Sequence, residues 1–145
     1  MHPPRNTLNL TFRKKTGALI QLLFFCLYLL FPCSVTAQPS NLLEGVYSEE
    51  QARQGEALYT EHCAHCHDIE FYKNSLATWN GMTVLDYWYR ILGNMPADNP
   101  KSLSDDNYLA IVAWVLAING YPTGPEPLSP GNYLGRLKIE RNNLN

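Results

Sequence analysis

The chain has 145 residues, of which 46% are hydrophobic and 17% charged, and its formal net charge at pH 7 is −2. This length suits a single domain. The lack of a basic excess argues against nucleic acid as a partner, because binding to phosphates requires a basic patch.

Residues 1–37 have the three parts of a secretory signal peptide. The start, "MHPPRNTLNLTFRKKTG", carries basic residues and no acid, and the apolar run "ALIQLLFFCLYLLF" follows. That run is shorter than the roughly 20 residues that a membrane-spanning helix needs. Val35 and Ala37 are small residues at the positions that signal peptidase recognises. We predict export to the periplasm with cleavage after Ala37, and an uncleaved leader that anchors the protein in the membrane is the alternative.

Cleavage after Ala37 changes both the charge and the cysteine content. It removes four of the eleven Lys and Arg residues and leaves seven against thirteen Asp and Glu, a formal charge of −6. Cys26 and Cys33 leave with the leader, so Cys63 and Cys66 are the cysteines of the mature chain. An acidic exported protein is suited to docking on a positively charged surface.

The first predicted helix begins near residue 49 and continues into the segment "EHCAHCHDIE". Ser48 is a suitable N-cap, and Gln51 three residues later suggests a capping box. Gly55, Tyr59 and Cys63 are spaced four residues apart and therefore share one helix face.

Three interpretations compete for Cys63 and Cys66. A redox-active disulfide is expected in a strand–helix context of the thioredoxin kind, which this sequence lacks. A structural zinc site requires four ligands, and the mature chain has no second cysteine pair. The pattern C-x-x-C-H, completed by His67, is the attachment signal for c-type haem. In that interpretation both thiols form thioethers, and the imidazole of His67 binds the iron.

A sixth iron ligand is sought among the remaining side chains. Met95 precedes Pro96 in the polar segment "GNMPADNP", which favours a loop. Met82 suits a core-filling role better. His62 and His65 lie beside the attachment point, and we expect them to be exposed.

Two further helices are predicted from apolar spacing and capping residues. Apolar residues in 83–93 recur at i, i+3, i+4 and i+7. The last helix begins after Ser104, an N-cap, and ends near Asn119–Gly120. Its run from Tyr108 to Ile118 is apolar nearly all round, which predicts burial on more than one side.

The sequence resembles the class I cytochromes c through "G…LY…CAHCH", the later "MP" and the aromatic C-terminal helix. Within that class it is similar to the small single-haem cytochromes and cytochrome domains associated with bacterial quinoprotein alcohol dehydrogenases, in which "NMP", "LSD" and "NGYP" recur. The resemblance covers residues 48–122. It implies an all-α cytochrome c fold, with three to four helices around one covalently bound haem c. We expect the cytochrome domain at 38–122 and a proline-rich extended tail, on the surface or free, at 123–145.

The resemblance also implies roles for individual residues. Met95 is expected as the second axial ligand of the iron. Gly55 and Trp114 are expected to meet where the first and last helices cross, and Trp79 and Arg90 to contact a haem propionate. One feature departs from the class, because no proline lies between His67 and Met95 to supply a carbonyl for the imidazole N–H. Another backbone carbonyl must accept that proton, or the histidine is oriented differently.

The predicted function is electron transfer by an exported single-haem protein, without substrate chemistry of its own. Expected partners are redox proteins, namely a periplasmic quinoprotein dehydrogenase as donor and a terminal oxidase or another cytochrome as acceptor. Alternatives are a haem-based gas sensor or haem enzyme with a displaceable sixth ligand, and a thiol protein without haem.

Overall fold

The computed structural model describes Gln21 and residues 38–140. The chain divides into two units, residues 1–37 and 38–145. Apart from Gln21, the predicted signal peptide lies outside the described residues, so its cleavage after Ala37 stays a prediction. In the described part of the chain, no helix combines the length and the apolar character needed to cross a membrane.

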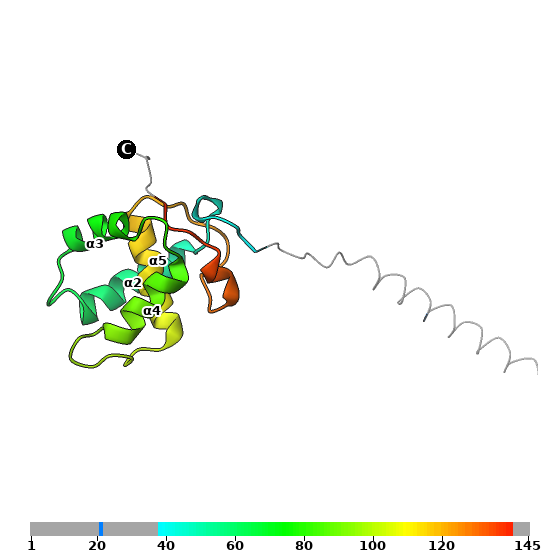
Figure 1. The fold of residues 1–145 in the computed structure, drawn as a ribbon. Helices are drawn as coiled ribbons and strands as arrows, with labels where there is room; N and C mark the ends of the chain where they lie inside the picture. The colour runs from blue at the N-terminus through cyan, green and yellow to red at the C-terminus, as the bar shows by residue number, and fades with distance from the viewer. Residues whose placement is uncertain (1–20, 22–37, 141–145) are drawn as a thin grey trace, which may run out of the picture. The chain divides into compact units, whose positions relative to one another are not determined.

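Residues 38–140 are helical and contain one isolated β-bridge, between Thr83 and Lys138. This agrees with the predicted all-α class. The elements in chain order are η1 (Leu42–Glu44), α2 (Glu49–His62), α3 (Ile69–Ser75), η2 (Leu76–Trp79), α4 (Val84–Asn94), α5 (Asp105–Ile118) and η3 (Asn132–Gly135) (Figure 1).

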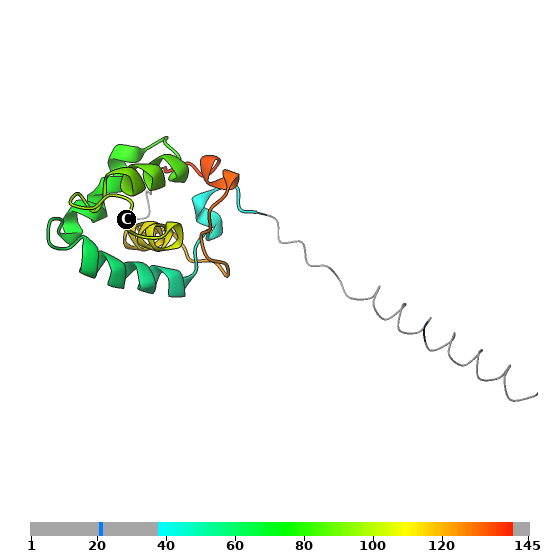
Figure 2. The same ribbon diagram turned by 90° about the horizontal axis from the view of Figure 1, so that it is seen from below.

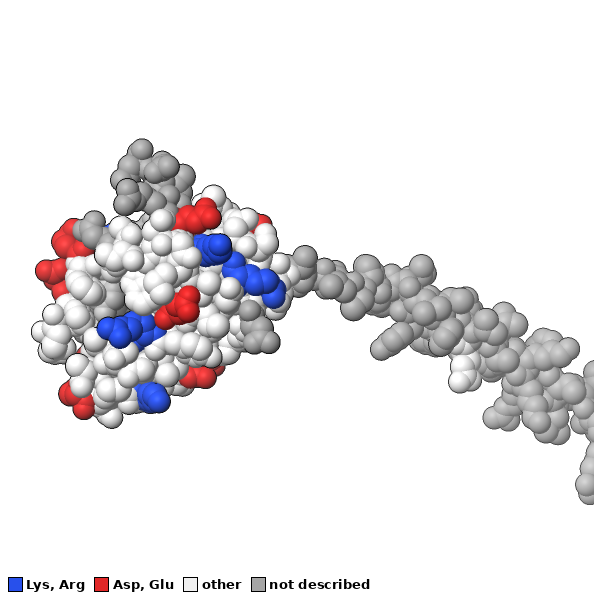
Figure 3. Space-filling view, in the orientation of Figure 1, with Lys and Arg blue, Asp and Glu red and all other residues white. Residues whose placement is uncertain are grey.

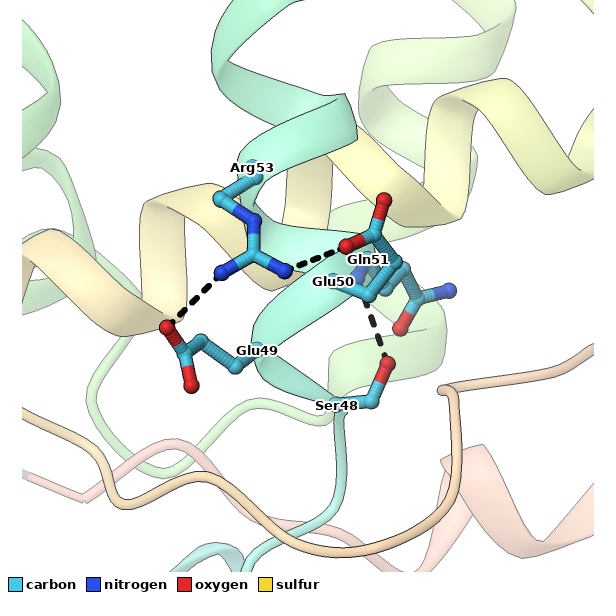
Figure 4. Close-up of polar contacts among 5 residues, drawn as sticks. All are labelled: Ser48, Glu49, Glu50, Gln51 and Arg53. Carbon is cyan, nitrogen blue, oxygen red and sulfur yellow. Dashed lines mark hydrogen bonds and ion pairs between the residues drawn. The ribbon is translucent and has the colours of Figure 1, made fainter.

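The start of α2 is fixed by side chains of its own first turn (Figure 4). The Ser48 hydroxyl accepts a hydrogen bond from the Gln51 backbone N–H at 3.2 Å, which satisfies one of the free donors of the helix terminus. Arg53 forms ion pairs with Glu49, at 2.9 Å, and with Glu50. These side chains are exposed, so the pairs contribute little to stability. Ser48 is therefore the N-cap of α2, as the sequence predicts.

The two later helices also begin where their caps predict. Thr83 and Asp86 form a reciprocal capping box at the start of α4. The Ser104 hydroxyl accepts from the backbone N–H of Asn107 at the start of α5. Beyond the end of α5, Gly120 has a φ of +81°, a conformation in which glycine carries no steric cost. The predicted helices at 83–93 and after Ser104 are thus confirmed to within about one residue.

Helix α5 is the centre of the domain. Every side chain from Tyr108 to Leu116 is buried. The helix packs mainly against α2 and also contacts α4 and α3. Figure 2 shows α5 between α2 and α4. The nearly uniform apolar character of α5 follows from this position, because a helix that is covered on several sides has no polar face.

The crossing of α2 and α5 has no room for a side chain at Gly55. A Cβ atom there would lie 1.9 Å from the carbonyl oxygen of Ala110 and 2.9 Å from Cβ of Trp114. The expected meeting of Gly55 with Trp114 is confirmed. The closest neighbour, however, is the Ala110 backbone, one turn earlier on α5.

The expectation that the C-terminal tail lies on the surface or free is wrong for residues 123–140. Leu128, Leu134, Leu137 and Ile139 are each at most 2% exposed and belong to the hydrophobic core. The prolines give this segment an extended path, but its leucines supply apolar surface that is more stable when buried. The sequence interpretation weighed the prolines and missed the spacing of these apolar residues.

Hydrogen bonds attach the same segment to the helices. The side chain of Gln51 accepts from the Leu128 N–H and donates to the Leu128 carbonyl, both at 2.7 Å. Gln51 is therefore used here and does not complete the predicted capping box. The N–H of Val84 donates to Leu137 at 2.9 Å, and the N–H of Ile139 donates to Met82 at 2.8 Å. Residues 123–140 thus form part of the fold.

Gly55→Ala is expected to lower the free energy of unfolding by about 2–4 kcal/mol, because the added Cβ forces α2 away from α5. Urea unfolding followed by circular dichroism measures the change. Gly93→Ala is the matched control, since Gly93 lies in α4 and nothing lies within 4 Å of its added Cβ. The control is expected to be neutral or to stabilise by about 0.5–1 kcal/mol. Equal effects of the two substitutions would contradict the tight crossing.

Leu137→Ala is expected to cost about 2–4 kcal/mol, because Leu137 is 0% exposed and its removal leaves a cavity. Leu43→Ala, at a side chain that is 60% exposed, is expected to change stability by less than about 0.5 kcal/mol. The same unfolding measurement compares the two. A loose tail predicts no difference between them.

Candidate functional site

A cavity of ≈ 690 Å³ opens between the end of α2, the turn that follows it and the loop after α4. Its volume lies within the range of about 300–1,000 Å³ that is typical of cofactor sites. Its lining residues are Glu61, His62, Cys63, His65, Cys66, His67, Met95, Pro96, Ala97, Asp98, Asn99, Ser102 and Leu103. The structure therefore brings together Cys63, Cys66, His67 and Met95, the residues that the sequence predicts as haem attachment points and axial ligands.

The turn after α2 places the two cysteines and the histidine within one hydrogen-bonded segment. The N–H of Cys63 donates to the Tyr59 carbonyl at 2.8 Å and continues the helix. The N–H groups of Cys66 and His67 both donate to the Cys63 carbonyl, at 3.1 and 3.0 Å. Cys63 is buried and Cys66 is exposed. These hydrogen bonds turn the segment from Cys63 to His67 back on itself. All three side chains therefore line the same cavity.

Neither competing interpretation of the cysteines gains support. Cys63 and Cys66 are free thiols and not a disulfide. Burial raises the pKa of the Cys63 thiol, although a hydrogen bond with Tyr72 opposes this, and a reactive redox cysteine needs a lowered thiol pKa. Within Gln21 and residues 38–140, no three His, Cys, Asp or Glu side chains are arranged to hold a metal ion between them. The zinc interpretation therefore lacks a ligand set.

His67 is half-buried and contacted on several sides. The Tyr59 hydroxyl donates to the backbone carbonyl of His67 at 2.7 Å. The Phe71 ring stacks on the imidazole, with centroids 4.8 Å apart and planes at 25°. Tyr72 meets the imidazole edge-on, with centroids 5.7 Å apart. Helix α2 thus holds the main chain of His67 through Tyr59, and α3 supplies both contacts to the imidazole ring.

Met95 is the C-cap of α4 and begins the loop that covers the cavity. Its N–H donates to the Ile91 carbonyl at 2.8 Å, and its own carbonyl accepts from the Tyr108 hydroxyl at 2.7 Å. Met82, the other methionine of the mature chain, does not line the cavity and is 44% exposed. The expectation that Met82 fills the core is therefore wrong, because it lies in a turn on the surface.

The remaining predicted site residues lie away from this cavity. Trp79 is half-buried and packs edge-on against Tyr87, with centroids 5.1 Å apart. Arg90 is exposed on α4. Neither residue lines the cavity, so their propionate contacts stay predictions. Among the described residues, Trp88 carries the buried side-chain N–H that has no hydrogen-bond partner. Trp88 does not line the cavity, so this donor gives no evidence for a cofactor there.

The donor set fits a covalently attached haem. Two thiols for thioether bonds, one imidazole nitrogen and one thioether sulfur all line the same cavity. The sequence proposed these four residues as candidates, and the structure places them around one cavity. The sequence did not identify the two tyrosine hydroxyls that hold the backbone of His67 and Met95, because a tyrosine within a helix gives no local signal of its hydrogen-bond partner.

Residues 50–115 match the family described as "Cytochrome C oxidase, cbb3-type, subunit III". The match spans the C-x-x-C-H motif, Met95 and most of α5. It supports a class I c-type cytochrome. With the helices described above, it also agrees with the predicted cytochrome c fold, and the class indicates haem binding and electron transfer. Neither a curated protein nor a solved structure is detectably similar to the chain.

Met95→Ala in the haem-loaded protein is expected to abolish the weak red absorption band that reports a ferric iron–thioether bond. Met82→Ala is the control, because Met82 lies outside the cavity, and is expected to leave the band intact. Absorption spectra of the two oxidised variants measure the outcome. If the band survives in Met95→Ala, Met95 is not the sulfur ligand of the iron.

Proposed function

We propose that this protein is an exported single-haem c-type cytochrome that carries electrons between a periplasmic dehydrogenase and the respiratory chain. One observation carries the proposal: a single cavity is lined by Cys63, Cys66, His67 and Met95. When bound there, haem supplies an iron that alternates between Fe(II) and Fe(III).

The chain contributes attachment, ligation and exclusion of small molecules. The two cysteines would hold the cofactor covalently, and His67 and Met95 would supply a nitrogen and a sulfur ligand to its iron. Soft thioether sulfur favours ferrous iron and therefore raises the reduction potential. The Tyr108 hydrogen bond that holds the Met95 carbonyl favours a closed sixth position over the displaceable ligand of a sensor.

The charges of the molecule favour a partner with a basic surface. The side chains that line the cavity include the carboxylates of Glu61 and Asp98 and no lysine or arginine. Figure 3 shows acidic and basic side chains interspersed on the face viewed, with broad uncharged surface between them. Carboxylates at a redox site steer a basic partner and reject an acidic one.

Two kinds of partner follow from different observations. The matched family is described by the name of a cytochrome c oxidase subunit, which supports an oxidase or a neighbouring cytochrome as electron acceptor. The similarity of residues 94–122 to cytochromes associated with quinoprotein alcohol dehydrogenases supports such an enzyme as electron donor. Export places the protein in the periplasm, and it stays at the membrane only if the leader is uncleaved.

The mass of the secreted protein tests the proposal directly. It is expected to equal that of residues 38–145 plus one haem, and acid-acetone is expected to leave the pigment on the protein. Replacing both cysteines, Cys63→Ala with Cys66→Ala, is expected to remove the covalent pigment. A secreted wild-type chain with the mass of the polypeptide alone would refute the proposal. Rapid carbon monoxide binding by the reduced wild-type protein would favour the sensor instead.

A further inference from the structure

Two buried tyrosine hydroxyls hold the main chain at the two predicted iron ligands. The Tyr59 hydroxyl donates to the His67 carbonyl, and the Tyr108 hydroxyl donates to the Met95 carbonyl, both at 2.7 Å. Tyr59 is 7% exposed and Tyr108 is 1% exposed. Each ligand segment is irregular, so these bonds tie two loops to two regular helices.

The two helices are the ones that cross most tightly. Tyr59 lies one turn after Gly55 on α2, and Tyr108 lies two residues before Ala110 on α5. A Cβ on Gly55 would lie 1.9 Å from the Ala110 carbonyl oxygen, so the helices cannot approach further. The same crossing therefore fixes both tyrosines relative to each other.

Packing also restricts the Tyr59 ring. It stacks on Trp114 of α5, with centroids 4.2 Å apart and planes at 20°. It meets Tyr72 edge-on at 5.4 Å, and Tyr72 in turn contacts the His67 imidazole. A ring that is held on two sides presents its hydroxyl in one position.

We propose that Tyr59 and Tyr108 are positioning residues that set the separation and orientation of His67 and Met95 through their backbone carbonyls. The inference rests on the proposed haem ligation and assigns the control of that ligation to the α2–α5 crossing. Tyr108 keeps the Met95 loop closed over the sixth position. Tyr59 anchors the His67 main chain to α2.

The test compares Tyr59→Phe and Tyr108→Phe with Tyr47→Phe in the haem-loaded protein. Tyr47 is the matched control, because its buried hydroxyl also donates to a backbone carbonyl, that of Tyr121, and Tyr121, unlike His67 and Met95, does not line the cavity. Each substitution removes one hydroxyl and keeps the ring. Imidazole is the probe, since it displaces a methionine ligand from ferric haem.

Tyr108→Phe is expected to bind imidazole about fivefold more tightly than wild type. The substitution removes one hydrogen bond that stabilises the Met95-ligated state, so imidazole displaces Met95 more easily. Tyr47→Phe is expected to bind it as wild type does. In the imidazole complex, where Met95 is already displaced, Tyr59→Phe is expected to shift the haem-methyl proton resonances. These shifts depend on the orientation of the axial imidazole of His67, so Tyr108→Phe and Tyr47→Phe are expected to leave them in place.

The inference is overturned if Tyr59→Phe and Tyr108→Phe both match Tyr47→Phe in imidazole affinity and in haem-methyl shifts. That outcome would leave the proposed function intact. A wild-type protein without covalent haem would instead overturn the proposed function. Each variant tests a different ligand, Tyr59→Phe for His67 and Tyr108→Phe for Met95. If one variant does not fold, the result of the other decides the inference. If neither folds, hydrogen exchange in the wild-type haem protein decides: slow exchange of both phenolic protons supports the inference, and rapid exchange of both contradicts it.

Discussion

The contact between α2 and α5 at Gly55 is the constraint on which the rest of the domain depends. It brings the Ala110 carbonyl to a distance that no other residue type at position 55 allows. Because α5 is buried along its length, displacement of α2 would disturb its packing against α4 and α3 as well. The attachment turn follows directly after α2, and α5 supplies the Tyr108 hydroxyl that holds the Met95 carbonyl.

The site is consequently built from a turn and a loop, and helices hold both of them in place. The C-x-x-C-H turn continues from α2, and the Met95 loop begins at the end of α4. Irregular backbone needs partners for its carbonyl groups, and two of these carbonyls, at His67 and Met95, receive tyrosine hydroxyls. In a protein that transfers electrons, fixed ligands limit the rearrangement that accompanies a change of oxidation state. The structure therefore relates a packing feature, the helix crossing, to the chemistry of the site.

The C-terminal segment shows how a composition rich in proline conceals a structural role. Prolines between 122 and 130 indicate an extended chain, and the structure forms no helix or strand there. Extended chain is not necessarily loose, however, since its apolar side chains are buried when a neighbouring surface accepts them. Gln51 supplies both a donor and an acceptor to Leu128, which replaces the hydrogen bonds that an extended segment would otherwise make with water. Residues 123–140 therefore close the domain on the side of the α2 N-terminus.

The sequence by itself determined the helices at 49–62, 84–94 and 105–118, because capping residues and apolar spacing are local signals. It also determined which side chains are candidates for haem attachment and ligation, since a five-residue motif and one Met-Pro pair contain that information. Only the tertiary structure decided that Leu128 and Leu137 belong to the core, that Met82 is exposed, and that Tyr59 and Tyr108 hold the carbonyls of His67 and Met95. Each of these outcomes depends on which distant surface meets the residue, and a hydrophobic or hydroxyl group carries no local record of its partner.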